Sequence, residues 1–348
     1  MSEFDPVQGA TTVGTKTEGH ALGALLGLAV GDAFGTTLEF TSPTPVPFET
    51  VLTGPHVAVT GGGPFAVVRG QVTDDTMMAV CLWRSLNACK RFSADDVARR
   101  YVAWAKETFD IGVQTDAALR RIEGGMSPLD AGRSVWLAAE RRPAGNGSLM
   151  RTAPIGVFFA RDADLRVRAT VMDSQLTHAD PRCILACAAL NGAIAAAVRG
   201  DATDVDASFA AARADVDAAF ALLPGDPEDA TARLAIESDL RAASELAPAL
   251  FSEELHMHRM QGFVRVALRL AFFELAARRS FAEALVNVVN RGGDADTNGA
   301  IVGALLGAVK GEAAIPAPFK DAVLSALDAS PHGPLRDEYH PRVFCERA

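Results

Sequence analysis

The sequence predicts an all-α protein, folded as a compact helical bundle, and three observations support this fold class. Apolar residues recur at the i, i+3, i+4 spacing of a helix along most of the 348-residue chain. The alternation of apolar and polar residues that is typical of strands is nearly absent. Alanine is very frequent, whereas aromatic residues make up only 7% of the chain, and such small side chains favour closely packed helices over a β-sandwich.

The expected helices follow one another along the chain. The first covers residues 18–33. The others are expected at 75–90, 94–108, 114–124, 128–141, 163–176, 181–199, 203–222, 228–247, 258–278, 280–290, 298–311 and 319–329. A break at Pro224, Gly225, Asp226 and Pro227 predicts a turn. The polar segment 203–247 around this break is therefore expected to form a peripheral helical hairpin.

Two of the expected helices carry stripes of glycine at every fourth position. The stripes are Gly23, Gly27 and Gly31 in the first helix, and Gly299, Gly303 and Gly307 near the C-terminus. A stripe without side chains lets another helix approach closely. We therefore expect both helices to be central and to pack tightly against each other.

The segment 35–70 separates the first two helices and is rich in proline, glycine and threonine, so no helix is expected there. Long loops of this kind are often functional lids or binding loops. Residues 1–16 are polar and rich in glycine and threonine, as expected of a flexible leader. No low-complexity linker divides the rest of the chain, and we expect 17–348 to form a single domain.

Composition and charge exclude several classes of function. The chain is 49% hydrophobic and 22% charged, as in a globular protein, and its net charge of −10 argues against nucleic-acid binding. Five cysteines without a CxxC motif suggest neither a zinc knuckle nor a disulfide framework, and reduced thiols fit a cytoplasmic location. We expect no signal peptide, and no apolar run of the roughly 18–20 residues that a membrane helix needs.

Oxygen-bearing side chains are concentrated in residues 293–297, directly before an apolar run. Asp294 and Asp296 stand at i and i+2 in a glycine-rich turn, where both carboxylates can point at one cation. Hard divalent cations take oxygen ligands of this kind. Helix capping is the alternative, because Asp and Thr are ordinary N-cap residues and acidic groups suit the positive end of a helix.

A second group of oxygen-bearing residues, Thr73, Asp74 and Asp75, stands at an expected helix start, where capping is again the alternative. Capping explains the two groups together less well than either alone. If their four carboxylates converged without a cation, they would repel one another and be costly to desolvate. One or two Mg²⁺ or Mn²⁺ ions would remove both costs.

Six motifs occur in one order along the chain. They are GLAVGDAFG at 27–35 followed by Glu39, TDDTMMA at 73–79, DIGVQT at 110–115, GNGSLMR at 145–151, QLTH at 175–178 and GDADT at 293–297. In this order the chain resembles the ADP-ribosylglycohydrolases, of the kind that reactivates dinitrogenase reductase. The resemblance implies an all-α fold with a binuclear Mg²⁺ or Mn²⁺ centre in a cleft. It also implies hydrolysis of the bond between ADP-ribose and an acceptor, most often an arginine side chain.

The resemblance implies roles for individual residues. The implied metal ligands are Thr73, Asp74, Asp75, Asp294, Asp296 and Thr297. Glu39 matches a loop glutamate that reaches the metals, and Asp110 matches an acid that contacts the substrate. The implied catalytic residues are Glu39, Asp75, Asp110 and Asp296, with Asp296 beside the metals and one of the other three handling the proton.

Residues 145–178 supply the implied substrate contacts. Gly145, Asn146, Gly147 and Ser148 match the loop that holds the diphosphate and ribose, and His178 matches a histidine beside the substrate. A Gly-Asn-Gly turn can present main-chain N–H groups to phosphate. Bland alternatives are an ordinary turn at 145–147, a structural role for His178 and a capping role for Asp110.

Two alternatives to removal of ADP-ribose from arginine remain open. The bond cleaved could be that of serine-linked ADP-ribose, O-acetyl-ADP-ribose or a modified nucleotide. The chain could instead bind ADP-ribose without catalysis, or act as an immunity protein that blocks a toxin ADP-ribosyltransferase through its leader and its 41–70 loop. The presence of Asp74, Asp75, Asp294 and Asp296 argues against a loss of catalysis.

Overall fold

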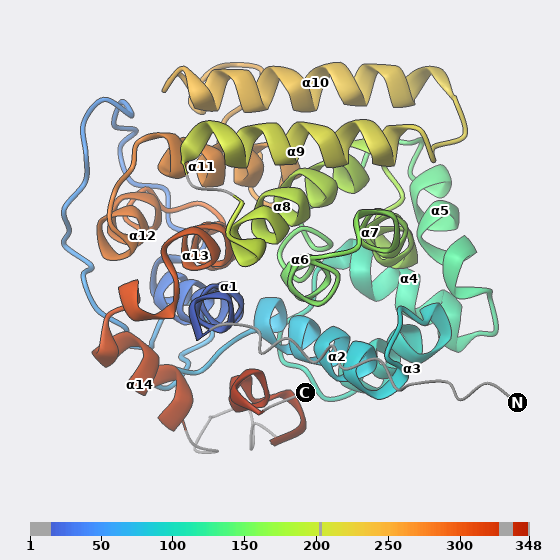
Figure 1. Ribbon diagram of the computed structural model, residues 1–348, viewed down its shortest axis with the longest axis horizontal. Helices are drawn as coiled ribbons and strands as arrows, with labels where there is room; N and C mark the ends of the chain where they lie inside the picture. Colours follow the sequence, from blue (N-terminus) through green and yellow to red (C-terminus); the bar gives the residue numbers. More distant parts are fainter. Residues whose placement is uncertain (1–14, 202–203, 327–336, 347–348) are drawn as a thin grey trace, which may run out of the picture.

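The computed structural model describes residues 15–201, 204–326 and 337–346, and this part of the chain is built from helices (Figure 1). The described residues form no β-sheet and make only isolated bridges. The α-helices are α1 (Thr15–Gly35), α2 (Asp74–Cys89), α3 (Ala94–Ala105), α4 (Val113–Glu123), α5 (Pro128–Ala138), α6 (Ala153–Phe158), α7 (Ala163–Thr177), α8 (Pro181–Arg199), α9 (Val205–Phe220), α10 (Pro227–Ser244), α11 (Val264–Ala276), α12 (Phe281–Val289), α13 (Ala295–Lys310) and α14 (Ala317–Ser325). Short 3₁₀ turns are η1 (Thr36–Leu38), η2 (Glu312–Ala314), η3 (Asp337–Tyr339) and η4 (Pro341–Cys345). The expected all-α class is confirmed.

Every expected helix is present, although several ends differ from the prediction. The largest difference is at 258–278, where α11 begins only at Val264, because Gly262 has a φ of 75° that helical backbone does not adopt. The short helix α6 was not expected.

The predictions for the two ends of the chain, a leader at 1–16 and a helix at 319–329, fall only partly within the described residues. Helix α1 begins at Thr15, inside the expected leader, and residues 1–14 of that leader lie outside the described part of the chain. Residues 327–329 of the last expected helix lie outside it as well, and α14 covers the expected residues up to Ser325.

Helices α1 and α13 lie side by side at the centre of the molecule (Figure 1). They run antiparallel, and their glycines meet in pairs. A Cβ atom added to Gly27 would lie only 2.2 Å from the carbonyl oxygen of Gly303. The same close approach pairs Gly23 with Gly307 and Gly31 with Gly299. Both expectations for the glycine stripes, a central position and tight packing, are therefore confirmed.

The expected hairpin is formed by α9 and α10, which lie together along one edge of the bundle (Figure 1). Buried ion pairs fasten this hairpin to the bundle. Arg166 of α7 donates two hydrogen bonds to Asp215 of α9, at 2.7 and 2.8 Å. Arg265 of α11 makes a similar pair with Asp239 of α10, at 2.6 and 2.9 Å. Because each arginine donates two parallel hydrogen bonds to one carboxylate, such pairs fix the orientation of the two helices as well as holding them together.

The 41–56 segment runs over the surface, as the long blue trace beside α12 in Figure 1. Three residues at the end of α12 fasten it. Asn287 accepts a hydrogen bond from Leu52 N, Asn290 exchanges two with the main chain of His56, and Arg291 donates to the carbonyls of residues 46 and 50. The segment is thus tied to the chain that leads directly into Asp294.

Two helices, Thr17–Leu38 and Pro181–Arg199, are long and apolar enough to cross a membrane by length and composition alone. The expectation that no apolar run reaches this length is therefore wrong for these two segments. Each contains an 18-residue window of high mean hydropathy with at most two charged residues. Their windows are 78% and 94% buried inside the molecule, and core helices pass the same test of length and composition.

Substituting Gly27 by alanine should lower the free energy of unfolding by about 1–3 kcal/mol, because the new methyl group overlaps the backbone of α13. Gly19→Ala is the matched control in the same helix. A Cβ at Gly19 meets nothing within 4 Å, so this variant should be neutral or up to about 1 kcal/mol more stable through its helix propensity. Urea unfolding of both variants measures the difference. Equal stability of the two variants would refute the role of the glycine contact.

Candidate active site

The two acidic groups meet because α1 orients the start of α2. Asp32, near the end of α1, accepts hydrogen bonds from Thr73 N at 3.0 Å and from Thr73 Oγ1 at 2.9 Å. It also accepts from the main-chain N–H of Thr76 at 3.2 Å. Asp32 therefore caps α2 from another helix. Burial raises its pKa to about 6.

The residues expected as helix caps do not act as caps. Thr73 and Asp294 occupy the N-cap positions of α2 and α13, and neither makes a side-chain capping bond. Thr73 Oγ1 instead donates to Asp32 and, at 3.2 Å, to Asp75. Asp110 does not cap α4 either, since its N-cap is Gly112 without a side-chain bond. Side-chain capping therefore does not explain Thr73, Asp294 or Asp110. Asp74, Asp75 and Asp296 do stand in the first turns of α2 and α13, where acidic groups suit the positive end of a helix.

A compact group of carboxylates could hold a metal ion. Glu39, Asp294 and Asp296 each offer an oxygen, and these oxygens lie within 4.8 Å of one another. Glu39 Oε2 is buried and has no hydrogen-bond partner, and the same is true of Asp75 Oδ1 in the wall behind the group. Buried carboxylate oxygens without a partner are costly, and a divalent cation would satisfy them. The residues present therefore fit a hard divalent cation.

The pKa values of these acids show how strongly negative the region is. Burial, followed by repulsion from Asp110 and Asp294, raises the pKa of Glu39 to about 8. Burial and repulsion from Asp32 and Asp294 raise the pKa of Asp110 to about 7. Burial and neighbouring carboxylates also hold the pKa values of three further acids well above their usual range. These acids are Asp74, Asp75 and Asp296.

The acids open into a cavity of about 340 Å³. Among the described residues that line it there is no lysine or arginine to balance the carboxylates. The 145–148 loop also lines the cavity, and its main chain pairs with residues 262–264 through Asn146 N to Gly262 O at 2.8 Å. The Asn146 amide donates to Asp294 at 2.7 Å, so the loop is fixed directly to the carboxylate group.

The sequence matches the family model of the ADP-ribosylglycohydrolases over residues 14–340. The chain belongs to this family. It is 28% identical over 313 residues to an ADP-ribosylarginine hydrolase of Serratia proteamaculans, covering 87% of this chain and 75% of that protein. It is 29% identical over 323 residues to the ADP-ribosyl-dinitrogen reductase glycohydrolase of Rhodospirillum rubrum, covering 90% and 92%.

A solved structure agrees with the family match. A chain described as an ADP-ribosylglycohydrolase-related protein complex has a TM-score of 0.65 and 31% sequence identity, covering 88% of this chain and 93% of its own. The resemblance inferred from the six motifs is thereby confirmed. This ADP-ribosylglycohydrolase is a hydrolase, and its relatives act on ADP-ribosyl groups.

The structure brings most of the predicted site residues of the ADP-ribosylglycohydrolase to one cavity. Those that line it are Glu39, Asp74, Asp110, Gly145, Asn146, Gly147, His178, Asp294, Asp296 and Thr297. Thr73 and Asp75 lie fully buried behind this lining. Ser148 is also fully buried, and its hydroxyl accepts hydrogen bonds from Ser174 at 3.0 Å and from the Cys187 thiol at 3.5 Å. The Ser148 side chain thus supports the loop from behind.

Eight further described residues line the cavity and were not predicted as site residues. They are Phe40, Gly112, Val113, Gln114, Thr115, Met150, Gln261 and Gly262. Gln114 and Thr115 belong to the DIGVQT motif, which could have indicated them. Gln261 and Gly262 fall within a segment that the apolar spacing assigns to a helix. The glycine directly before Phe263 was the available signal for a turn there.

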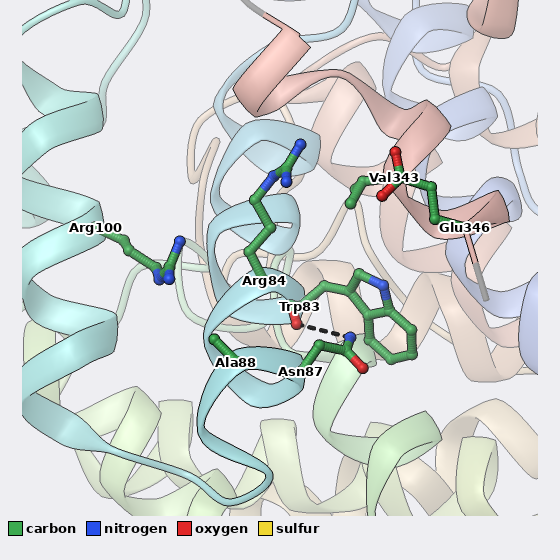
Figure 2. Close-up of a pocket in the computed structure, with 7 residues that line it drawn as sticks. All are labelled: Trp83, Arg84, Asn87, Ala88, Arg100, Val343 and Glu346. Carbon is green, nitrogen blue, oxygen red and sulfur yellow. Dashed lines mark hydrogen bonds between the residues drawn. The ribbon is translucent and has the colours of Figure 1, made fainter. Parts of the chain in front are cut away.

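A second hollow of about 250 Å³ lies beside α2, between Arg100 of α3 and the C-terminal residues Val343 and Glu346 (Figure 2). The Asn87 amide in it donates to Trp83 O at 2.9 Å. None of the residues lining this hollow was predicted as a site residue, and the carboxylate group lies elsewhere.

Stability should depend on pH and on divalent cations together. The pKa values of Glu39 and Asp110 rise from 4.5 and 3.8 to about 8 and about 7 in the folded chain. The folded chain therefore holds these protons more tightly than the unfolded chain. The free energy of unfolding of the metal-free protein should fall as pH rises from about 4.5 to 8. Mg²⁺ or Mn²⁺ should restore stability, most strongly at pH 8 where the ligands are ionised.

Thermal unfolding from pH 5 to 8, in EDTA and in excess metal, measures this linkage. The gap in Tm between the two conditions should widen as pH rises. Glu39→Gln, which removes one of the carboxyl groups with a raised pKa, should flatten the pH dependence in EDTA. A gap that is absent, or constant over this range, would contradict the metal assignment.

Proposed function

We propose that this protein is a metal-dependent hydrolase that removes ADP-ribose from a modified arginine side chain of a protein, and so reverses mono-ADP-ribosylation. The observation that carries the proposal is the group formed by Glu39, Asp294 and Asp296. These acids meet at a cavity whose described lining contains no lysine or arginine. The name of the Serratia proteamaculans relative supports the arginine linkage. The expected complement is two Mg²⁺ or Mn²⁺ ions.

Residues of both acidic groups would hold the ions: Asp74, Asp75 and Thr73 on one side, and Asp294, Asp296 and Thr297 with Glu39 on the other. When bound, divalent cations would orient the ribose hydroxyls and lower the pKa of a water molecule, so that it can act as the nucleophile. The bond to the acceptor is then broken through an oxocarbenium-like transition state, as in other glycosidic cleavage. The Asn146 amide keeps Asp294 oriented through its hydrogen bond of 2.7 Å.

The acidic cavity also suits the leaving group. A released guanidine is strongly basic and becomes a cation, which carboxylates at the cavity stabilise. Asp110 lines the cavity without belonging to the compact metal-binding group. Burial is the first cause of its raised pKa, which is about 7 in the metal-free chain, and burial favours the protonated form that can give a proton to the departing nitrogen. We assign the general acid to Asp110 on this basis.

The 145–148 loop offers neutral donors for an anionic diphosphate. The main-chain N–H of Gly147 donates to no described residue, and a Cβ at this position would lie 2.8 Å from His178 Cε1. Glycine is therefore required there, because a side chain would meet the His178 ring. A turn of this kind suits a phosphate oxygen.

Asp296→Asn should remain folded and lose at least about 100-fold of metal-dependent ADP-ribose release, because it removes a carboxylate from the metal group. Release from an ADP-ribosyl-arginine peptide with Mg²⁺ or Mn²⁺ is followed by chromatography, with circular dichroism as the test of folding. Asp164→Asn is the control, since the Asp164 side chain is 72% exposed in a surface pair, and it should keep full activity.

The same assay separates the linkages. Serine-linked ADP-ribose and O-acetyl-ADP-ribose are offered in parallel, and arginine-linked substrate should be cleaved fastest. Full activity of Asp296→Asn, or activity unaffected by EDTA, would refute the metal mechanism. Tight binding of a toxin ADP-ribosyltransferase that survives Asp296→Asn would instead indicate a blocking role.

Asp110→Asn should lower kcat by about 100-fold, because it removes the proton donor. Metal affinity, measured by calorimetry, should change much less than in Asp296→Asn. Activity of the wild type should decline as pH rises above the pKa of Asp110, and this alkaline decline should be absent from the residual activity of the variant. Loss of metal binding equal to that of Asp296→Asn would show that Asp110 is a ligand instead.

A further inference from the structure

A buried chain of hydrogen bonds leads to the cavity wall. The hydroxyl of Tyr101 and Nε of Arg151 donate to the two oxygens of Asp173, at 3.0 and 3.2 Å. Arg151 Nη1 donates to Thr177 Oγ1 at 2.9 Å, and Thr177 Oγ1 lies 2.7 Å from His178 Nδ1. All five side chains are at most 2% exposed. The partner of Arg151, which the sequence did not reveal, is thus Asp173.

The donors in this chain fix the direction of the last hydrogen bond. A guanidinium group only donates, so Thr177 Oγ1 accepts from Arg151. The hydroxyl retains one proton, and His178 Nδ1 is the acceptor that it contacts among the described residues. If Nδ1 carried a proton instead, the buried hydroxyl proton would have no acceptor, which is costly. The proton of the imidazole is therefore on Nε2.

The imidazole is also neutral. Burial and the nearby positive charge of Arg151 lower the pKa of His178 to about 3, so the ring does not take a second proton near neutral pH. Its Nε2 edge faces the 145–148 loop, where a Cβ on Gly147 would lie 3.0 Å away. His178 lines the cavity, and Nε2 makes no hydrogen bond with any described residue. The buried ring thus carries, in the wall of the cavity, an N–H group that has no partner among the described residues.

We propose that Thr177 is a positioning residue that fixes His178 as the Nε2–H tautomer, and that this N–H donates to an oxygen of bound ADP-ribose. The ligand rests on the proposed function, whereas the tautomer rests on the hydrogen bonds alone. The opposite tautomer would turn a lone pair of Nε2 toward the ligand oxygen, and the two would repel.

Nitrogen NMR of the full-length wild type, labelled at histidine, tests the tautomer without any ligand. The signals of His178 are assigned by their loss in His178→Gln. Nε2 should carry the proton and Nδ1 should be bare, unchanged between pH 5.5 and 8. A protonated Nδ1 would overturn the proposal, whatever the enzyme cleaves. Addition of saturating ADP-ribose should shift the Nε2–H signal, and an unaffected signal would overturn the contact with the ligand.

The role of Thr177 is tested with a matched pair of variants. Thr177→Val keeps the shape but lacks the hydroxyl, so it should weaken ADP-ribose binding by about tenfold and lose the fixed tautomer. Thr177→Ser keeps the hydroxyl and should bind within about twofold of the wild type. Unchanged affinity of a folded Thr177→Val would overturn the positioning role.

If Thr177→Val does not fold, the spectra of the wild type and of Thr177→Ser test the role of the Thr177 hydroxyl. The serine variant should show the same protonated Nε2 and the same shift with ADP-ribose, and a changed tautomer there would overturn the role of the hydroxyl. A wild-type protein that binds no ADP-ribose would refute the proposed function and the ligand contact, while the free spectrum would still decide the tautomer.

Discussion

The close approach of α1 to α13 determines where every other part of the site lies. Glycine pairs bring the two backbones into direct contact, and the contact continues to the end of α1, where a Cβ on Gly35 would lie 2.4 Å from Asp296 Cα. Asp32, one turn earlier in α1, caps α2 and so fixes Asp74 and Asp75. One helix therefore positions both acidic groups, although they are more than 200 residues apart in sequence.

The same contact brings carboxylates together in a buried place, and this lowers the stability of the metal-free fold. Burial beside one another raises the pKa values of Glu39, Asp75 and Asp296, so the metal-free folded state is destabilised by ionised carboxylates. Neither Thr73 nor Asp294 recovers any of this cost by capping its helix. A region that departs from ordinary helix rules in this way is typical of a functional site.

Features that depend on neighbouring residues in the sequence could be predicted, whereas contacts between distant parts of the chain could not. Helix periodicity and the glycine stripes are local patterns, and the structure confirms them. The capping of α2 by Asp32 depends on a partner from another helix, so no local pattern shows it. The turn at Gln261 and Gly262 was hidden in a segment with helical spacing, because periodicity does not register a single residue with positive φ.

The burial of Ser148 shows the limit of a motif as evidence. Its motif places it in a substrate loop, yet its hydroxyl contacts Ser174 and Cys187 on the far side. Gly147 and His178, by contrast, line the cavity. The cavity lining thus combines carboxylates, suited to cations and to a basic leaving group, with neutral polar side chains. This mixed lining is what the proposed function requires, because that function places an anionic diphosphate next to acids.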